Sequence, residues 1–215
     1  MKRLFAMAGL TLLLAAPAAA QFAGMPVWNS PKGGTGVTIN GDMGLPNTDA
    51  GKGTAFGARA TLGLANLSLT AGLSTWTPEG LDQAVTTFGG GAAFRVIGGS
   101  LMPVAINLVV GAGRSAESGT GLSTIPAATH IVAGAGVSAG LPTPGVSIEP
   151  YVTVTNRWTA VSGNTDSNVG VTFGANLGFG MFGVHVAYDT MSDGGVTRSV
   201  IGVGAHVALK APIGM

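Results

Sequence analysis

The sequence predicts an all-β protein, a transmembrane antiparallel up-and-down β-barrel of about ten strands, with eight and twelve as the neighbouring possibilities. Three observations lead to this fold class. Apolar residues recur at every second position over most of the chain. Short turns alternate with longer polar loops. Charged residues within the predicted strands keep to one face.

The composition already excludes several classes of protein. The chain has 215 residues, of which 37 are Gly, 46% are hydrophobic and only 9% are charged. An average soluble domain has about 7% Gly and about 25% charged residues. The chain is too apolar to be disordered, its net charge of +1 offers no attraction to nucleic acid, and without Cys it has no disulfide framework.

Residues 1–20 have the pattern of a secretory signal peptide. Lys2 and Arg3 precede an apolar run over residues 4–16, and Ala18, Ala19 and Ala20 supply the small residues that signal peptidase requires. We expect cleavage before Gln21. An uncleaved anchor is the alternative, but the run is shorter than the roughly 20 residues that span a bilayer.

Residues 21–34 form a leader that precedes the barrel, which we expect over residues 35–215. Pro26, Pro31 and the pair Gly33 and Gly34 disfavour a stable helix. Three placements remain open for this leader: a periplasmic arm, a segment tucked into the lumen, or a flexible leader.

The strands follow from period-2 alternation, in which apolar residues on one face alternate with Gly, Ser, Thr, Asn and a few charges. They are expected around residues 37–43, 56–64, 67–73, 88–96, 102–110, 131–137, 146–154, 169–177, 182–188 and 201–209.

The connections divide into two kinds. Short turns are expected at 65–66, 98–100, 142–145 and 178–180, and longer loops at 45–53, 77–84, 113–124, 160–167 and 191–196. Bacterial outer-membrane barrels have this arrangement, with short turns at one end and longer loops at the other.

Six charged residues fall inside the strands, and all of them lie on the polar face: Asp42, Arg59, Arg95, Glu149, Arg157 and Asp189. A charge facing hydrocarbon near the bilayer midplane costs about 2–4 kcal/mol, so a lipid-facing surface has to exclude them. A soluble barrel also alternates, but it would carry many Lys and Glu on its polar face. The pattern therefore favours a barrel with lipid outside and a polar lumen.

On this pattern, residues 35 to about 210 resemble the small outer-membrane β-barrel proteins of Gram-negative bacteria, the class that includes OmpA-type, OmpX-type and OmpW-type barrels. The resemblance implies location in the cell outer membrane.

The short turns predict the strand register. Arg59 is expected opposite Gly72, Asn176 opposite His185, and Arg95 opposite Pro103. Pairing of Leu141 with Val146 would set Glu149 opposite Ser138, Tyr151 opposite Gly136 and Arg157 opposite His130. Asp189 is expected near Arg198. We expect a lumen polar network of Arg59, Arg95, Glu149, Tyr151, His130, Arg157, His185, Asn176 and His206.

Four aromatic residues are expected to form an aromatic belt facing the lipid headgroups: Trp158 and Tyr188 at the loop side, and Phe179 and Phe182 at the turn side.

These features predict an outer-membrane barrel that is either structural or a narrow pore passing small solutes through a Gly-rich lumen. The alternatives are a surface adhesion or ligand-binding barrel acting through its loops, and an outer-membrane enzyme acting on lipid or peptide. We expect no enzyme, no catalytic residue, no cofactor and no metal, because the three His are not at metal-ligand spacing and no nucleophile and base are brought together. The expected partners are outer-membrane lipid and small solutes, for a monomer that does not bind nucleic acid.

Overall fold

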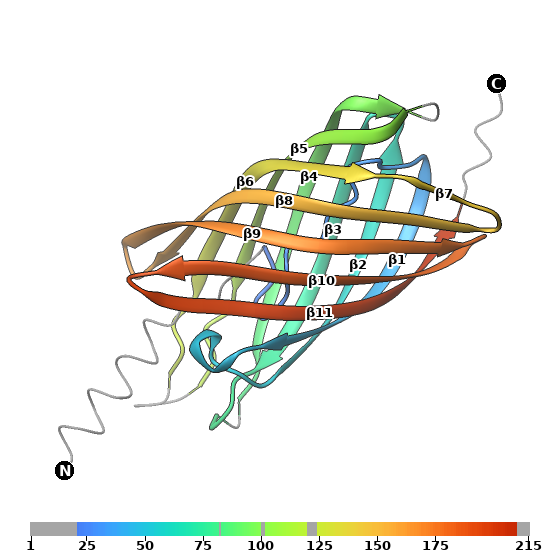
Figure 1. Cartoon of the computed structure of the whole chain (residues 1–215). Coiled ribbons are helices and arrows are strands. Elements are labelled where there is room, and N and C mark those ends of the chain that lie inside the picture. The colour runs from blue at the N-terminus through green and yellow to red at the C-terminus, as the bar shows by residue number, and fades with distance from the viewer. Residues whose placement is uncertain (1–20, 82, 100–101, 120–123, 210–215) are drawn as a thin grey trace, which may run out of the picture.

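The chain folds into a closed antiparallel β-barrel (Figure 1). The computed structural model describes residues 21–81, 83–99, 102–119 and 124–209. Each strand pairs with the next along the chain except β6 and β7, β1 pairs with β11, and the β6–β8 pairing completes the ring. The elements are β1 (Gly36–Pro46), η1 (Thr48–Ala50), β2 (Thr54–Leu64), β3 (Leu67–Thr77), β4 (Val85–Gly99), β5 (Met102–Ser115), β6 (Ala128–Ala139), β7 (Leu141–Thr143), β8 (Val146–Val161), β9 (Asn164–Phe179), β10 (Phe182–Asp193) and β11 (Val196–Leu209).

The predicted ten-strand barrel is confirmed. The short β7 pairs with β8, as β6 does, so β6 and β7 occupy one position in a ring that is otherwise made of long strands. Among the described residues, no helix is long and apolar enough to cross a membrane.

Two hairpins have the predicted register. Arg59 lies opposite Gly72, and Asn176 lies opposite His185. Both hairpins have two-residue turns, at residues 65–66 and 180–181. A two-residue turn fixes the pairing of all the residues that follow it, which is why turn chemistry was sufficient here.

Two other predicted registers are wrong. Arg95 lies opposite Asn107 rather than Pro103, because irregular pairings near Ile97 shift the β4–β5 register. The turn after β6 is also tighter than expected. Thr143 pairs with Val146, so the two-residue turn at 144–145 replaces the four-residue turn that the sequence predicted.

This tighter turn changes the register of β8, so each residue of β8 lies opposite a different residue of β6 from the one predicted. Tyr151 lies opposite Ser138, and His130 lies opposite Thr159 instead of Arg157. On its other side Tyr151 lies opposite Gly174. The predicted pairing of a tyrosine ring with a bare glycine therefore occurs, but with a different glycine.

The predicted loops at 160–167 and 191–196 are mostly strand. β8 and β9 are joined by Ser162 and Gly163 alone, and β10 and β11 by Gly194 and Gly195. All four residues have positive φ, which suits the turns that match the twist of a hairpin. The start of β9, from Asn164 to Ser167, is polar and exposed on both faces. The sequence analysis interpreted that polarity as loop.

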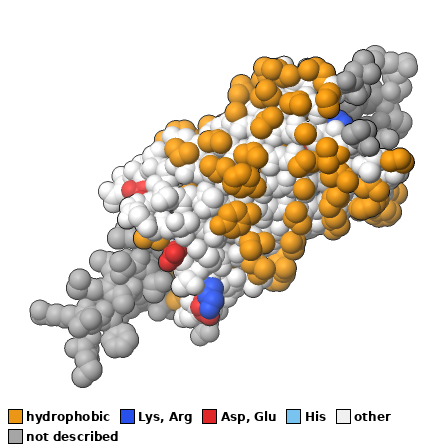
Figure 2. Space-filling model, viewed as in Figure 1, with side chains coloured by type: hydrophobic (Ala, Val, Ile, Leu, Met, Phe, Trp, Pro, Cys, Tyr) orange, Lys and Arg blue, Asp and Glu red, His pale blue; other side chains and the backbone are white. Residues whose placement is uncertain are grey.

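The barrel has two different ends. The turn end carries the short turns at 65–66, 144–145 and 180–181, and the loop end carries η1 and the connection between β5 and β6. Figure 2 shows hydrophobic side chains gathered over the turn-end part of the visible face, while the loop end is mostly polar. Large apolar side chains such as Phe88, Leu108 and Ile201 are more than half exposed, as expected of a surface that faces lipid.

The four residues of the predicted aromatic belt lie on this outer surface. Phe179, Phe182 and Tyr188 are exposed. Trp158 is half-buried, and its register partner is the exposed Ile131.

Residues 21–35, here called the lumen segment, lie inside the barrel and lead into β1 (Figure 1). This placement selects one of the three alternatives left open for the leader. The buried apolar core of the protein is formed largely by this segment and by the surrounding strands.

Candidate functional site

The candidate site is the lumen itself, which the lumen segment occupies from one end to the other. Phe22 and Ala23 pack at the loop end, and a turn formed by Met25 N–H donating to the Phe22 carbonyl redirects the chain toward the turn end. The segment then passes the middle of the barrel and reaches the turn end at Lys32 and Gly33.

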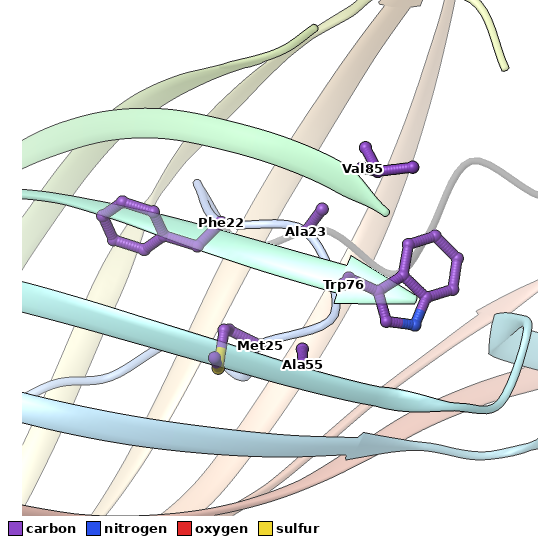
Figure 3. Close-up of a cluster of buried hydrophobic side chains, with 6 residues drawn as sticks. All are labelled: Phe22, Ala23, Met25, Ala55, Trp76 and Val85. Atoms are coloured by element: carbon purple, nitrogen blue, oxygen red, sulfur yellow. The ribbon is translucent and has the colours of Figure 1, made fainter. Parts of the chain in front are cut away.

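Apolar packing closes the loop end (Figure 3). Phe22, Ala23 and Met25 of the segment contact Ala55, Trp76 and Val85 of the barrel strands, and all six are buried. The indole of Trp76 donates to the Lys52 carbonyl at 2.9 Å, which fixes the ring. The sequence analysis gave no role to this cluster, although the inward parity of Trp76 was a signal for it.

A buried ion pair holds the middle of the segment. Both terminal nitrogens of Arg157 donate to Asp189, at 2.7 and 2.9 Å. The same carboxylate accepts from Thr172 at 2.7 Å and from the backbone N–H of Val27 at 2.9 Å. Asp189 therefore ties the segment to the strands while it neutralises Arg157, and charge-assisted bonds of this kind are the strong ones.

Hydrogen bonds between two amide side chains hold the segment at Asn29. Asn29 donates to the side-chain oxygen of Asn107 at 3.1 Å and accepts from Asn107 at 2.8 Å. Asn29 also donates to Thr153 at 2.9 Å. All three side chains are buried, so each bond satisfies a polar group that would otherwise be unpaired.

Two charged residues hold the turn end of the segment through the backbone of Lys32. Glu149 accepts from the Lys32 N–H and from the Ser30 hydroxyl, both at 2.8 Å. Arg95 donates to the Lys32 carbonyl and, at 2.7 Å, to Asn66. Arg95 and Glu149 are thus connected through the segment.

Trp28 lies beside a cluster of charged and imidazole side chains. Its ring lies 5.2 Å from the Arg59 guanidinium and packs edge-on against His185 at 4.6 Å between centroids. Asp42 accepts from Arg59 at 2.6 Å and lies 2.6 Å from His185 Nε2. The two Nδ1 atoms of His185 and His206 are 3.3 Å apart.

His130 belongs to a separate, fully buried group near the loop end. Its Nε2 lies 2.9 Å from the Ser115 hydroxyl, which in turn accepts from Thr87. A serine and a histidine at this distance resemble half of a hydrolase triad. The side of His130 that would meet an orienting acid faces Thr159 at 3.4 Å instead.

Glycines on the lumen side leave the space that the segment occupies. A Cβ at Gly202 would lie 2.5 Å from Pro26 and 2.7 Å from Trp28, and one at Gly44 would meet the carbonyl of Gly24. Other lumen glycines make room for side chains of the network, as Gly174 does for Tyr151. The high Gly content thus reflects close approach of a second layer inside the barrel.

A cavity of about 440 Å³ remains beside the segment. Its lining includes Thr38, Asn40, Thr61, Thr70, Asn176 and His206. The charged side chains of Arg59 and Glu149 and several apolar residues also line it, so the cavity is of mixed character. Among the described residues, no group of three or more His, Cys, Asp or Glu is placed to hold a metal ion.

The structure brings most of the expected lumen residues into contact with one another or with the segment. Arg59, His185 and His206 form one group, Glu149 and Asn176 another, and Arg157, Arg95 and His130 belong to three separate groups. The expected ion pair between Asp189 and Arg198 does not form, because Asp189 pairs with Arg157 and Arg198 with Asp193. Asp42 was expected on the lumen face without a partner, and Trp28, Asn29 and Asn107 were not expected in the site.

Comparison with known proteins identifies the fold and no closer relation. No protein-family model and no curated protein matches the sequence. The β domain of the Bordetella autotransporter BrkA is 9% identical with a TM-score of 0.54, covering 83% of this chain and 100% of that chain. Neisserial surface protein A (NspA) is 13% identical with a TM-score of 0.41, covering 81% and 98%. A bacterial polysaccharide outer membrane secretin is 9% identical with a TM-score of 0.48, covering 74% of this chain and 57% of that one.

At these identities the likeness concerns the fold alone. The closed antiparallel barrel that the alternation pattern predicted is the fold of this chain, and the BrkA β domain shares that fold.

Proposed function

We propose that the protein is a narrow pore of the cell outer membrane, closed at rest by its own lumen segment and opened for small polar solutes when that segment shifts. The observation that carries the proposal is the course of residues 21–35 through the lumen, from the cluster at Phe22 to the bonds at Lys32. The apolar outer surface supports residence in the outer membrane as a monomer in contact with lipid. The proposal includes that residues 1–20 direct export across the inner membrane and are then cleaved off.

The chemistry of the lumen supports a gate rather than a permanent core. The segment binds the middle and the turn end through hydrogen bonds to Asp189, Asn107 and Glu149. Water that enters the lumen can replace such bonds, so their net contribution is only about 0.5–1.5 kcal/mol each, or about 1.5–3 kcal/mol with a charged partner. A partial release of the segment is therefore far less costly than unfolding of the barrel.

The cavity indicates which solutes the pore would pass. Hydroxyl and amide groups from Thr38, Thr61, Thr70 and Asn176 line it, together with Arg59, which is paired with Asp42, and Glu149, which is hydrogen-bonded to the segment. A lining of this kind favours small neutral polar solutes over ions of one sign.

Planar-bilayer conductance tests the proposal. Three proteins are compared: the wild type, a variant lacking residues 22–34, and Gly41→Ala as a matched control, because a Cβ at Gly41 meets nothing within 4 Å. We expect low conductance with rare openings for the wild type and for Gly41→Ala, and a stable open conductance for the deletion. Heat-modifiable mobility on gels verifies that each barrel is folded. A folded deletion variant that conducts no more than the wild type would show that the segment is not the gate.

A further inference from the structure

We infer that Gln21 becomes the first residue of the mature chain and is converted there to pyroglutamate, whose neutral lactam ring is seated on a glycine platform inside the barrel. The inference adds a covalent modification site to the molecule and holds whether or not the barrel conducts. It rests on the predicted cleavage after Ala20 and on four observations about the site.

The first observation is a platform of bare backbone beneath Gln21. In the β4–β5 pairing, Gly89 lies directly opposite Gly113, and Gly91 directly opposite Gly111. These two glycine pairs, here called the glycine platform, face the lumen on adjacent strands. They present backbone without any side chain over an area that a flat amide or a five-membered ring can cover.

The second observation is that Gln21 occupies this platform closely. A Cβ at Gly89 would lie 2.7 Å from the Gln21 carbonyl oxygen, and one at Gly91 would lie 2.9 Å from the Gln21 side-chain oxygen. A Cβ at Gly111 would meet the Gln21 side-chain oxygen, and one at Gly113 would meet the Gln21 carbonyl. Because that carbonyl belongs to the backbone, Gly89 and Gly113 cannot carry a side chain while residue 21 keeps this position.

The third observation concerns the charge that cleavage creates. After cleavage the α-nitrogen of Gln21 would be a free ammonium group in the lumen, where residue 21 is half-buried beside the cavity and a charge without a counter-charge is disfavoured. The lumen carboxylates are already committed: Asp42 to Arg59 and His185, Asp189 to Arg157 and Val27, and Glu149 to Ser30 and Lys32. Within the described part of the chain, no carboxylate is hydrogen-bonded to Gln21.

The fourth observation is the residue type, since an N-terminal glutamine can remove this charge without outside help. The neutral α-nitrogen attacks its own side-chain Cδ and forms an N–Cδ bond. The Cδ–Nε2 bond breaks, and the leaving nitrogen takes the proton lost by the α-nitrogen and departs as ammonia. The product is a neutral five-membered lactam, and the step needs no oxidant, reductant or second substrate.

Glutamine is suited to this step in a way that its shorter homologue is not. The same attack in asparagine would close a four-membered ring, which is strained. Gln21→Asn therefore keeps a primary amide at the same place but retains the ammonium group, and it serves as the matched control.

Intact-mass measurement and N-terminal peptide mapping test the inference on protein extracted from outer membranes. We expect the wild-type chain to begin at Gln21 with the mass of one ammonia missing, and to resist N-terminal sequencing until a pyroglutamate aminopeptidase removes the first residue. Gln21→Asn should begin at residue 21 with its full mass and a sequenceable terminus. A wild-type chain that begins at another residue, or at Gln21 with a free amine, overturns the inference.

A stability measurement tests the claim that neutralisation matters at the platform. Gln21→Asn keeps a primary amide at the platform but cannot form the ring. We expect it to lower the urea midpoint of unfolding relative to the cyclised wild type. Equal midpoints for the two proteins would contradict a role for the neutral lactam at this seat, even if the mass measurement shows the ring.

Discussion

The two ends of the lumen hold the same segment by different means. At the loop end, Phe22 and Met25 are packed into an apolar cluster with Trp76 and are almost fully buried. At the turn end, Ser30 is exposed and the segment is held by directed bonds from Glu149 and Arg95 beside a polar cavity. Apolar burial is non-directional and excludes water, whereas the bonds at the turn end compete with water.

This difference predicts which end of the closed lumen opens first. The apolar cluster should keep solutes and water out at the loop end while the turn end exchanges its hydrogen bonds. Opening then begins at the turn end and proceeds toward the buried ion pair at Asp189.

The buried ion pair in the middle should dominate stability. Asp189→Asn leaves the Arg157 guanidinium buried without a counter-charge, and we expect the free energy of unfolding to fall by about 3–5 kcal/mol. The control on the same strand is Asp193→Asn, whose carboxylate is 41% exposed beside Arg198 and should matter by about 0–1 kcal/mol. Urea unfolding in lipid vesicles measures both. Equal losses would mean that burial of the pair is not what stabilises the middle of the lumen.

Truncating a buried apolar side chain at the loop end should lower the free energy of unfolding by nearly as much. Phe22→Ala removes a ring that is 2% exposed, and we expect a loss of about 3 kcal/mol, the lower part of the range for a buried Phe. Phe88→Ala is the comparison, because that ring is 60% exposed on the outer surface, where lipid can fill the space it leaves. The same unfolding measurement applies. A smaller loss for Phe22 than for Phe88 would refute the seal at the loop end.

A single methyl group can test how tightly the segment is seated. A Cβ at Gly44 would meet the Gly24 carbonyl and lie 3.2 Å from the Met25 sulfur, so Gly44→Ala should destabilise the protein by about 1–3 kcal/mol. Gly41→Ala on the same strand points into open space and should change stability by less than about 0.5 kcal/mol. Indistinguishable unfolding curves for the two variants would show that the segment does not press on β1.

The weakest effect on stability is expected at the turn end. Glu149→Gln keeps an acceptor for Ser30 and Lys32 but removes its charge, which should weaken the anchor by about 1 kcal/mol. Its signature should be kinetic, with more frequent openings in bilayer recordings than for the wild type. Asp166→Asn, at the exposed start of β9, is the control and should leave opening frequency unchanged. Openings made more frequent by Phe22→Ala than by Glu149→Gln would reverse the assignment of the yielding end.

The fold could be predicted from the sequence because the bilayer imposes a strict rule on each position. A charge facing hydrocarbon is so costly that the six charges of the predicted strands all keep to the inner face, and alternation alone then identifies the strands. The observed strands are longer, and Arg114, at the loop end of β5, is a charge that they add on the exposed face. Register was predictable at the two-residue turn of Ala65 and Asn66. It failed in the β4–β5 hairpin, where irregular pairing near Ile97 leaves no mark in the alternation, and before β8, where the Pro and Gly residues at 142–145 predicted a longer turn than the one that Thr143 and Val146 enclose.

The site was less predictable than the fold. The alternation pattern shows which charges lie on the inner face, but not what they bind. Asp189 pairs with Arg157 on a different strand and accepts a hydrogen bond from Val27 in the leader. The sequence does contain one signal for the site. Glycines recur on the inner face of neighbouring strands at Gly89, Gly91, Gly111 and Gly113, and such a cluster indicates that another part of the chain approaches closely.

The bond from Val27 to Asp189 joins residues 162 positions apart, which bears on how the protein folds. Contacts between such distant parts of a chain form slowly, because a long loop must close before the bond can form. The segment continues into β1, so the β1–β11 pairing that joins the first and last strands also brings the segment close to the strand that carries Asp189. Closure of the ring and seating of the segment therefore depend on the same long-range pairing.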